Sequence, residues 1–264
     1  MKLGLTSAAF YGRLETEDAA AFLREFDLDT CEVFLESLSE YTKDFGQLVR
    51  VKLVGLNCTS VHPKGTQFEP DLFGQSARQR TDAMHILRGV LDAGQALGAK
   101  YYVFHGPVSV LGRITLDRIR MLEERFGMMQ DEAHAHGMEI LWENVFYGAV
   151  SGAEDFREIC TRLPGTGFVL DLKQAWRGHV DPFAIVERYG RSIRHVHVLD
   201  RAADGSICLP GEGVYDLERL LKKLHGCGFD GSMIIEPYAY QTTDIEAVKR
   251  SVDYMRDIMA RASR

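Results

Sequence analysis

Short runs of apolar residues alternate with longer amphipathic stretches along the whole chain of 264 residues. The runs have the length and the β-branched or aromatic content of buried strands. Between them, apolar residues recur at spacings of three and four, which is the pattern of amphipathic helices. The strands are expected at residues 2–7, 30–35, 53–62, 99–105, 138–143, 167–172, 193–200 and 232–236.

The clearest helical patterns cover residues 76–98 and 116–137, and a last helix is expected over residues 244–262. The first two end in Gly98 and Gly137, and glycine most readily takes the left-handed conformation that follows a helix. Eight strand–helix units in 264 residues give about 33 residues per unit, which matches a (β/α)8 barrel of about 250 residues.

A doubly wound open sheet is the competing α/β fold. It usually carries a GxGxxG phosphate turn after its first strand, and TSAAFYGR at residues 6–13 offers none. The sequence therefore predicts an α/β protein, with one (β/α)8 TIM barrel domain spanning residues 1–264.

Charge and composition exclude several functions. A formal net charge of -7 argues against a protein that binds nucleic acid electrostatically. No apolar run approaches the roughly 18 residues of a membrane span, and no signal-peptide pattern precedes the first strand. The five cysteines are scattered without a CxxC pair, which indicates reduced thiols in a cytoplasmic protein. The sequence leaves the number of subunits open, including a homo-oligomer.

Polar residues end six consecutive predicted strands, from the third to the eighth. Because barrel enzymes carry their chemistry at the C-terminal ends of the strands, these side chains are expected around one cavity. Three are carboxylates, and facing carboxylates repel strongly unless a divalent cation lies among them. Glu143, which closes the apolar run 140–142, is therefore interpreted as a metal ligand. The six residues are His62, His105, Glu143, Asp171, His197 and Glu236.

Neighbouring polar and aromatic residues receive weaker interpretations. His195 lies two residues before His197, on the same strand face, and is expected deeper in the barrel, either supporting the site or in the core. Asp200 and Arg201 have the pattern of a solvated loop pair. Trp142 is expected in the core.

Seven short motifs lie in order along nearly the whole chain, and together they resemble the xylose isomerase-like barrels. This superfamily contains sugar isomerases and epimerases as well as zinc-dependent apurinic-site endonucleases. The motifs are SVHP (60–63), FHGP (104–107), WENV (142–145), LDLKQA (170–175), HVHVLD (195–200), LPGEGVYD (209–216) and IIEPY (234–238).

The resemblance implies a site for one divalent cation, Mn²⁺, Co²⁺, Mg²⁺ or Zn²⁺. Its expected ligands are Glu143, Asp171, His197 and Glu236. The endonucleases hold a further cation on two histidines and the same glutamate, which here match His62, His105 and Glu143. Their third zinc requires a histidine where this chain has Gln174 and an Asp-x-His near residues 205–208. Both are missing, so the trinuclear nuclease site does not form in that way.

Three carboxylates and an imidazole suit a hard or borderline cation, which polarises a sugar carbonyl as a Lewis acid. Glu143 and Glu236 are expected to be the catalytic pair, moving a proton α to that carbonyl through a metal-held cis-enediolate. The predicted activity is a metal-dependent isomerase or epimerase of a sugar or keto-sugar. His62 and His105 are expected to bind substrate hydroxyls or the second cation.

Two other readings remain open. One is a dinuclear metallohydrolase or a polyol dehydratase on the same barrel, and the other is a barrel that binds a sugar without turnover. Specificity is expected from side chains that follow the first, second and sixth strands. They are Phe10, Tyr11, Glu36, Lys173, Gln174 and Trp176.

Overall fold

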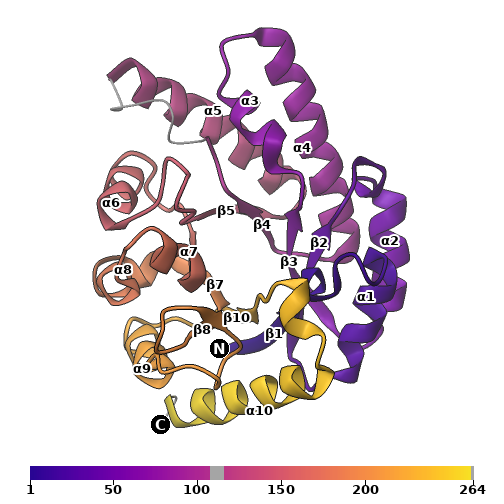
Figure 1. The fold of residues 1–264 in the computed structure, drawn as a ribbon. Coiled ribbons are helices and arrows are strands. Elements are labelled where there is room, and N and C mark those ends of the chain that lie inside the picture. Colours follow the sequence, from indigo (N-terminus) through magenta and orange to yellow (C-terminus); the bar gives the residue numbers. More distant parts are fainter. Residues whose placement is uncertain (108–115, 263–264) are drawn as a thin grey trace.

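Eight parallel strands form a closed barrel in the computed structural model, which describes residues 1–107 and 116–262 (Figure 1). Neighbouring strands follow the chain order, and β10 closes the ring between β7 and β1. The predicted (β/α)8 TIM barrel is therefore confirmed. The strands are β1 (Lys2–Thr6), β2 (Thr30–Leu35), β3 (Asn57–Pro63), β4 (Tyr101–Phe104), β5 (Glu139–Glu143), β6 (Phe168–Asp171), β7 (Ile193–Val198) and β10 (Ser232–Ile235).

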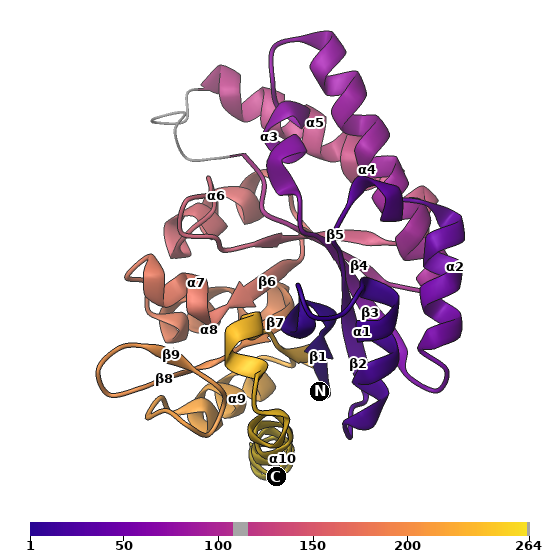
Figure 2. The ribbon, with the colours of Figure 1, turned by 45° about the vertical axis from the view of Figure 1, so that its right-hand side comes forward.

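Helices surround the barrel, and α10 lies beside α9 along one side of it (Figures 1 and 2). None of those in the described ranges has the length and hydropathy to cross a bilayer. The helices are α1 (Thr16–Phe22), α2 (Lys43–Lys52), α3 (Glu69–Leu72), α4 (Ala77–Leu97), α5 (Leu116–Ala135), α6 (Ala153–Arg162), α7 (Leu172–Arg177), α8 (Pro182–Tyr189), α9 (Leu217–Gly226) and α10 (Ile245–Ala262).

The helix expected over residues 76–98 is observed as α4, and its bounds follow from the residues at its two ends. The Ser76 hydroxyl accepts a hydrogen bond from the backbone N–H of Gln79, and Gly98 ends the helix with a φ of 81°. Two strand predictions were wrong at their ends. Residues 53–56 complete the turn after α2, so β3 begins only at Asn57. The strand expected at 193–200 stops at Val198, and Asp200 enters a separate ribbon of β8 (Asp200–Arg201) with β9 (Ile207–Cys208).

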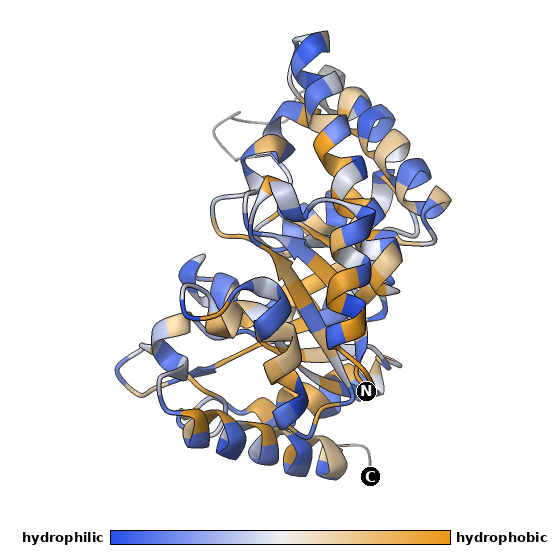
Figure 3. Cartoon of the chain, turned by 90° about the vertical axis from the view of Figure 1, so that its right-hand side faces the viewer, coloured by the Kyte–Doolittle hydropathy of each residue, from blue (hydrophilic) through white to orange (hydrophobic). Residues whose placement is uncertain are grey.

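Most of the core consists of buried apolar residues from the strands and the surrounding helices. The hydropathy colouring of Figure 3 shows hydrophobic residues in both layers. A second, small apolar cluster of Val103, Leu141 and Val169 is buried apart from it. Since alternate strand residues face the same side, the residues two positions further along these strands share that side. Those residues are His105, Glu143 and Asp171.

Candidate metal centre and active site

Three of the strand-end residues gather around a fourth, His197. Its Nδ1 atom lies 3.4 Å from Glu143 Oε1, 3.6 Å from Asp171 Oδ2 and 3.6 Å from Glu236 Oε2. All four residues are buried. The two glutamates approach from β5 and from the end of β10, and these distances keep Glu143 Oε1 and Glu236 Oε2 at most about 7 Å apart.

Three buried atoms of this group have no hydrogen-bond partner. They are Glu143 Oε2, Asp171 Oδ2 and His197 Nδ1. Their nearest polar neighbours are ion-pair contacts, at 3.0 Å for Glu143 Oε2, 3.6 Å for Asp171 Oδ2 and 3.4 Å for His197 Nδ1. Buried polar atoms are nearly always hydrogen-bonded, so converging atoms without such bonds are candidate metal ligands. Atoms of Glu143, Asp171 and His197 lie within 4.8 Å of one another. A set of carboxylate oxygens and one imidazole nitrogen suits a divalent cation, and the residues present fit one.

Asp171 has a separate role for each carboxylate oxygen. Oδ1 accepts the backbone N–H of Gln174 at 2.8 Å and caps α7, which leaves Oδ2 free for the centre. The Asn144 side chain fixes the same residue, because it donates to the Asp171 carbonyl at 2.9 Å and accepts the Asp171 N–H at 2.7 Å. Asn144 therefore ties the end of β5 to the end of β6. No role for it was predicted from the sequence.

Glu32 on β2 is the most important residue that the sequence analysis missed. It is fully buried, and its Oε2 atom lies 2.8 Å from Ser60 Oγ, 3.2 Å from His195 Nε2 and 3.2 Å from His197 Nε2. With Nε2 directed at Glu32, His197 presents Nδ1 to the centre, the arrangement by which carboxylates orient metal-binding imidazoles. His195 lies deeper and supports this network, as expected.

A second group of side chains, His62, His105 and Glu143, also converges. His62 Nε2 and His105 Nε2 are 3.1 Å apart, and they lie 3.5 and 3.0 Å from Glu143 Oε2. His62 Nδ1 lies 3.0 Å from the Pro63 carbonyl oxygen, which only accepts. His62 therefore carries a proton on Nδ1, and its neutral form presents the Nε2 lone pair to the group. Tyr147 OH contacts His105 Nδ1 at 2.9 Å.

Glu69 on α3 holds the backbone that carries His105, and no sequence signal pointed to it. Its carboxylate accepts the N–H groups of His105 and Gly106, both at 2.9 Å, and the Tyr102 hydroxyl at 2.6 Å. Gly106 has a φ of 78°, and a Cβ there would lie 2.7 Å from the Trp142 ring. Burial raises the pKa of Glu69 to about 7, although these donors oppose the shift.

The pKa values of the three carboxylates of the centre shift in different directions. Burial would raise the pKa of Glu143, but the charge of His105 and hydrogen bonds from the surrounding histidines hold it well below its usual value. Burial raises the pKa of Asp171 to about 6, with Lys173 opposing and the neighbouring glutamates adding to the shift. Burial is outweighed at Glu236 by the charge of Lys173, so its pKa is lowered.

The remaining predicted specificity residues divide into two groups. Lys173 and Gln174 follow Asp171 on α7, and Lys173 Nζ lies 2.6 Å from Glu236 Oε2. Glu36 and Trp176 have their described contacts elsewhere: the Glu36 N–H donates to Glu40, and Trp176 packs edge-on against Tyr215.

Phe10 and Tyr11 also contact groups outside the four-residue centre. The Phe10 ring stacks near Phe26, and the Tyr11 ring contacts the Lys64 ammonium. The structure thus brings Lys173 into the centre, with Gln174 beside it on α7.

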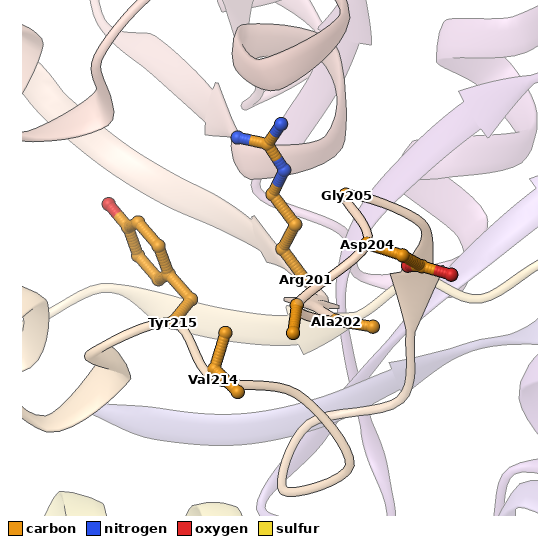
Figure 4. Close-up of a pocket in the computed structure, with 7 residues that line it drawn as sticks. Arg201, Ala202, Asp204, Gly205, Val214 and Tyr215 are labelled. Carbon is orange, nitrogen blue, oxygen red and sulfur yellow. The ribbon is translucent and has the colours of Figure 1, made fainter.

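Asp200 was wrongly interpreted as solvated. Its side chain is buried, and its carboxylate accepts backbone N–H groups of Gly211, Gly213 and Tyr215 at 3.1–3.2 Å, which fixes the loop of the LPGEGVYD motif. Arg201 and Tyr215 line a surface pocket of about 360 Å³ beside this loop (Figure 4). The pocket shares no lining residue with the four-residue centre.

Solved structures with this fold include sugar epimerases and proteins similar to them. A D-tagatose 3-epimerase-like protein superposes with a TM-score of 0.81 at 18% identity, covering 99% of this chain and 98% of that one. The IolI protein, solved with a bound zinc atom, gives 0.79 at 19% identity, covering 99% of each chain. The 3-keto-D-glucoside 4-epimerase of E. coli gives 0.77 at 17% identity, covering 97% of this chain and 99% of that one.

At the level of sequence, no curated protein gives a significant match. The family model described as xylose isomerase-like TIM barrel matches residues 20–258. This match covers most of the chain and includes every residue of the four-residue centre. The chain belongs to the xylose isomerase-like TIM barrel family.

Proposed function

We propose that the chain is a divalent-metal-dependent isomerase or epimerase of a keto-sugar. The observation that carries this proposal is the placement of two carboxylates, Glu143 and Glu236, on different strands around His197 Nδ1. A cation held there by Glu143, Asp171, His197 and Glu236 supplies Lewis-acid polarisation of the substrate carbonyl. The sugar epimerases among the solved structures support the substrate class.

Glu143 and Glu236 are the proposed proton-transfer pair. A substrate carbon between them has a carboxylate on each side, so that one removes the proton α to the carbonyl and the other returns it. The lowered pKa of each glutamate keeps it ionised, which is the form that a base requires. Return to the same carbon from the opposite face gives epimerisation, and return to the neighbouring carbon gives isomerisation.

His62 and His105 are proposed to hold the substrate hydroxyls on the Glu143 side. Their Nε2 atoms point to Glu143 Oε2 and to each other, so a hydroxyl entering this group finds both a donor and an acceptor. Tyr147 extends the same hydrogen-bond chain outward through His105. The group also moves a proton between substrate oxygen atoms without further side chains.

A dinuclear metallohydrolase is the second candidate. Ligand atoms of His62, His105 and Glu143 lie within 4.8 Å of one another, which is the spacing that a second cation requires. Metal stoichiometry separates the candidates, because the isomerase or epimerase requires one cation per chain and the hydrolase requires two.

Solvent-deuterium exchange tests the proposed function. Purified protein is loaded with Mn²⁺ or treated with EDTA, then incubated in D₂O with a panel of ketoses and keto-polyols. We expect deuterium at the carbon α to the carbonyl only with metal. A cation at 100 times its Kd also adds about 2.7 kcal/mol to the free energy of unfolding. If EDTA changes neither the melting temperature nor the exchange, the proposal is wrong.

A further inference from the structure

Lys173 places a positive charge at the atoms that the proposed cation would bind. Its Nζ atom lies 2.6 Å from Glu236 Oε2 and 3.6 Å from Asp171 Oδ2. These are the same oxygens that lie 3.6 Å from His197 Nδ1. The Lys173 side chain is only 7% exposed. Its ammonium therefore lies inside the carboxylate cluster rather than at its solvent edge.

The fold leaves this side chain little choice of position. Lys173 is the second residue of α7, which directly follows Asp171, and Asp171 Oδ1 caps the helix. The lysine is thus fixed two residues from one proposed ligand and reaches across to another on a different strand. The Tyr238 ring lies 4.9 Å from Nζ and covers it on another side.

A bound divalent cation and this ammonium compete for the same oxygens. Metal–oxygen bonds of about 2.0–2.6 Å to Glu236 Oε2 and Asp171 Oδ2 would place two cations a few ångströms apart in a buried site, where repulsion is weakly screened. Without the metal, the ammonium offsets the repulsion between the carboxylates. Removal of one partner from a buried ion pair leaves an uncompensated charge and destabilises the fold.

We infer that Lys173 is a built-in counter-cation that stabilises the metal-free site and is displaced from Glu236 and Asp171 when a divalent cation binds. This inference rests on the proposed metal-dependent function. It gives the protein two states of its centre with the same carboxylates, one closed by an ammonium and one by a metal. The lysine thus lowers the metal affinity while it maintains the geometry of the empty site.

Titration calorimetry with Mn²⁺ tests the inference on the wild type and on Lys173→Met. The variant removes the ammonium and keeps a long flexible side chain. We expect Lys173→Met to bind Mn²⁺ at least about tenfold more tightly, within the usual range of coupling between two ligands. In EDTA, its melting temperature should fall by about 5 °C or more. Lys173→Gln provides the same comparison if the methionine variant does not fold.

Arg177→Met is the matched control. Arg177 lies one helical turn further along α7, and its guanidinium also approaches the Tyr238 ring, at 5.4 Å. Its described contacts are with the aromatic rings of Phe146 and Tyr238. The control removes the same charge without touching the proposed ligand oxygens, so we expect at most about a twofold change in Mn²⁺ affinity, as for a largely screened exposed charge.

The outcomes separate this inference from the proposed function. If Lys173→Met and Arg177→Met bind Mn²⁺ more tightly by the same factor, the change is a general effect of charge and the inference is wrong. Unchanged or weaker Mn²⁺ binding by Lys173→Met would also overturn it. In either case, the metal-dependent function would stand. Failure of all three proteins to bind Mn²⁺ or any other divalent cation would overturn the proposed function and the inference together. A rise in Mn²⁺ affinity that is confined to the Lys173 variants supports displacement of the ammonium by the metal.

Discussion

The two carboxylates proposed for catalysis lie in different chemical surroundings. On the imidazole side of the centre, Glu143 faces His62, His105 and His197, whose ring nitrogens can each donate or accept a hydrogen bond according to the tautomer. On the ammonium side, Glu236 faces Lys173, a group that stays charged. Both surroundings lower the pKa of their glutamate. His197 contacts both glutamates, but only the imidazole side adds two further imidazoles, His62 and His105, that can pass a proton on. One barrel mouth thus combines a proton-relaying side and a charge-fixing side.

Removing either base should have the largest effect. Glu143→Gln and Glu236→Gln keep the side-chain shape but lose the proton acceptor, so turnover should fall by about 10²–10⁴-fold. We expect the deficit to persist at saturating Mn²⁺, where metal occupancy is restored. Solvent-deuterium incorporation into a substrate measures the step directly.

Asp171→Asn is the control for the two glutamine variants. It changes a proposed ligand without a proton-transfer role, so added metal should restore most of its exchange. If Glu143→Gln and Glu236→Gln both regain wild-type deuterium exchange at saturating Mn²⁺, neither glutamate is the base, and His62 or His105 becomes the next candidate.

A pH experiment examines the support of the imidazole side. Burial raises the pKa of Glu69 to about 7, so the folded state holds its proton more tightly than the unfolded chain. That contribution to stability is complete below about pH 4.5 and is lost as the pH rises to about 7, amounting to about 3 kcal/mol. Denaturant unfolding over this pH range should show the free energy of unfolding of the wild type falling relative to that of Glu69→Gln as the pH rises. A constant difference would contradict the assignment.

Glu32→Gln tests the contact between Glu32 and His197, the imidazole that faces both catalytic carboxylates. The variant loses the charge that holds His197 Nε2, and loss of such a partner typically costs about 10–100-fold in metal affinity. Calorimetry with Mn²⁺ measures this loss. Ser60→Ala removes another hydrogen bond to the same Glu32 oxygen but keeps the carboxylate, and it should change affinity much less. Equal effects would make the network merely structural.

The smallest effect is expected from the histidines of the imidazole side. His62→Asn and His105→Asn should lower turnover by about tenfold, below the roughly 10²–10⁴-fold typical of a lost general base, while one cation stays bound. Metal analysis of each variant provides the check. If the wild type holds two cations and a variant holds one, the dinuclear hydrolase becomes the better reading.

The barrel and the strand-end residues were predictable because both depend on local patterns. Apolar runs define the strands, and alternation along a strand places Glu143 and Leu141 on the same side. Glu32 carried a similar signal, a charged residue inside an apolar run at 30–35, but its importance depends on His195 and His197, more than 160 residues away.

Other features of the site had no local sequence signal. Glu69 lies in the connection between β3 and α4, and its partners are backbone N–H groups that the sequence does not distinguish. The contact between Lys173 and Glu236 depends on how α7 meets the end of β10. Such contacts follow from the closed barrel and are not encoded in any one segment.

The double duty of Asp171 limits how the centre can be redesigned. One oxygen ends the turn into α7 and the other faces the metal position. A histidine at this position supplies a ligand atom but no second acceptor for the Gln174 N–H, and a glutamate has a longer side chain that no longer fits the cap. Exchanges at Asp171 intended to retune the metal preference must therefore also supply an acceptor for the Gln174 N–H.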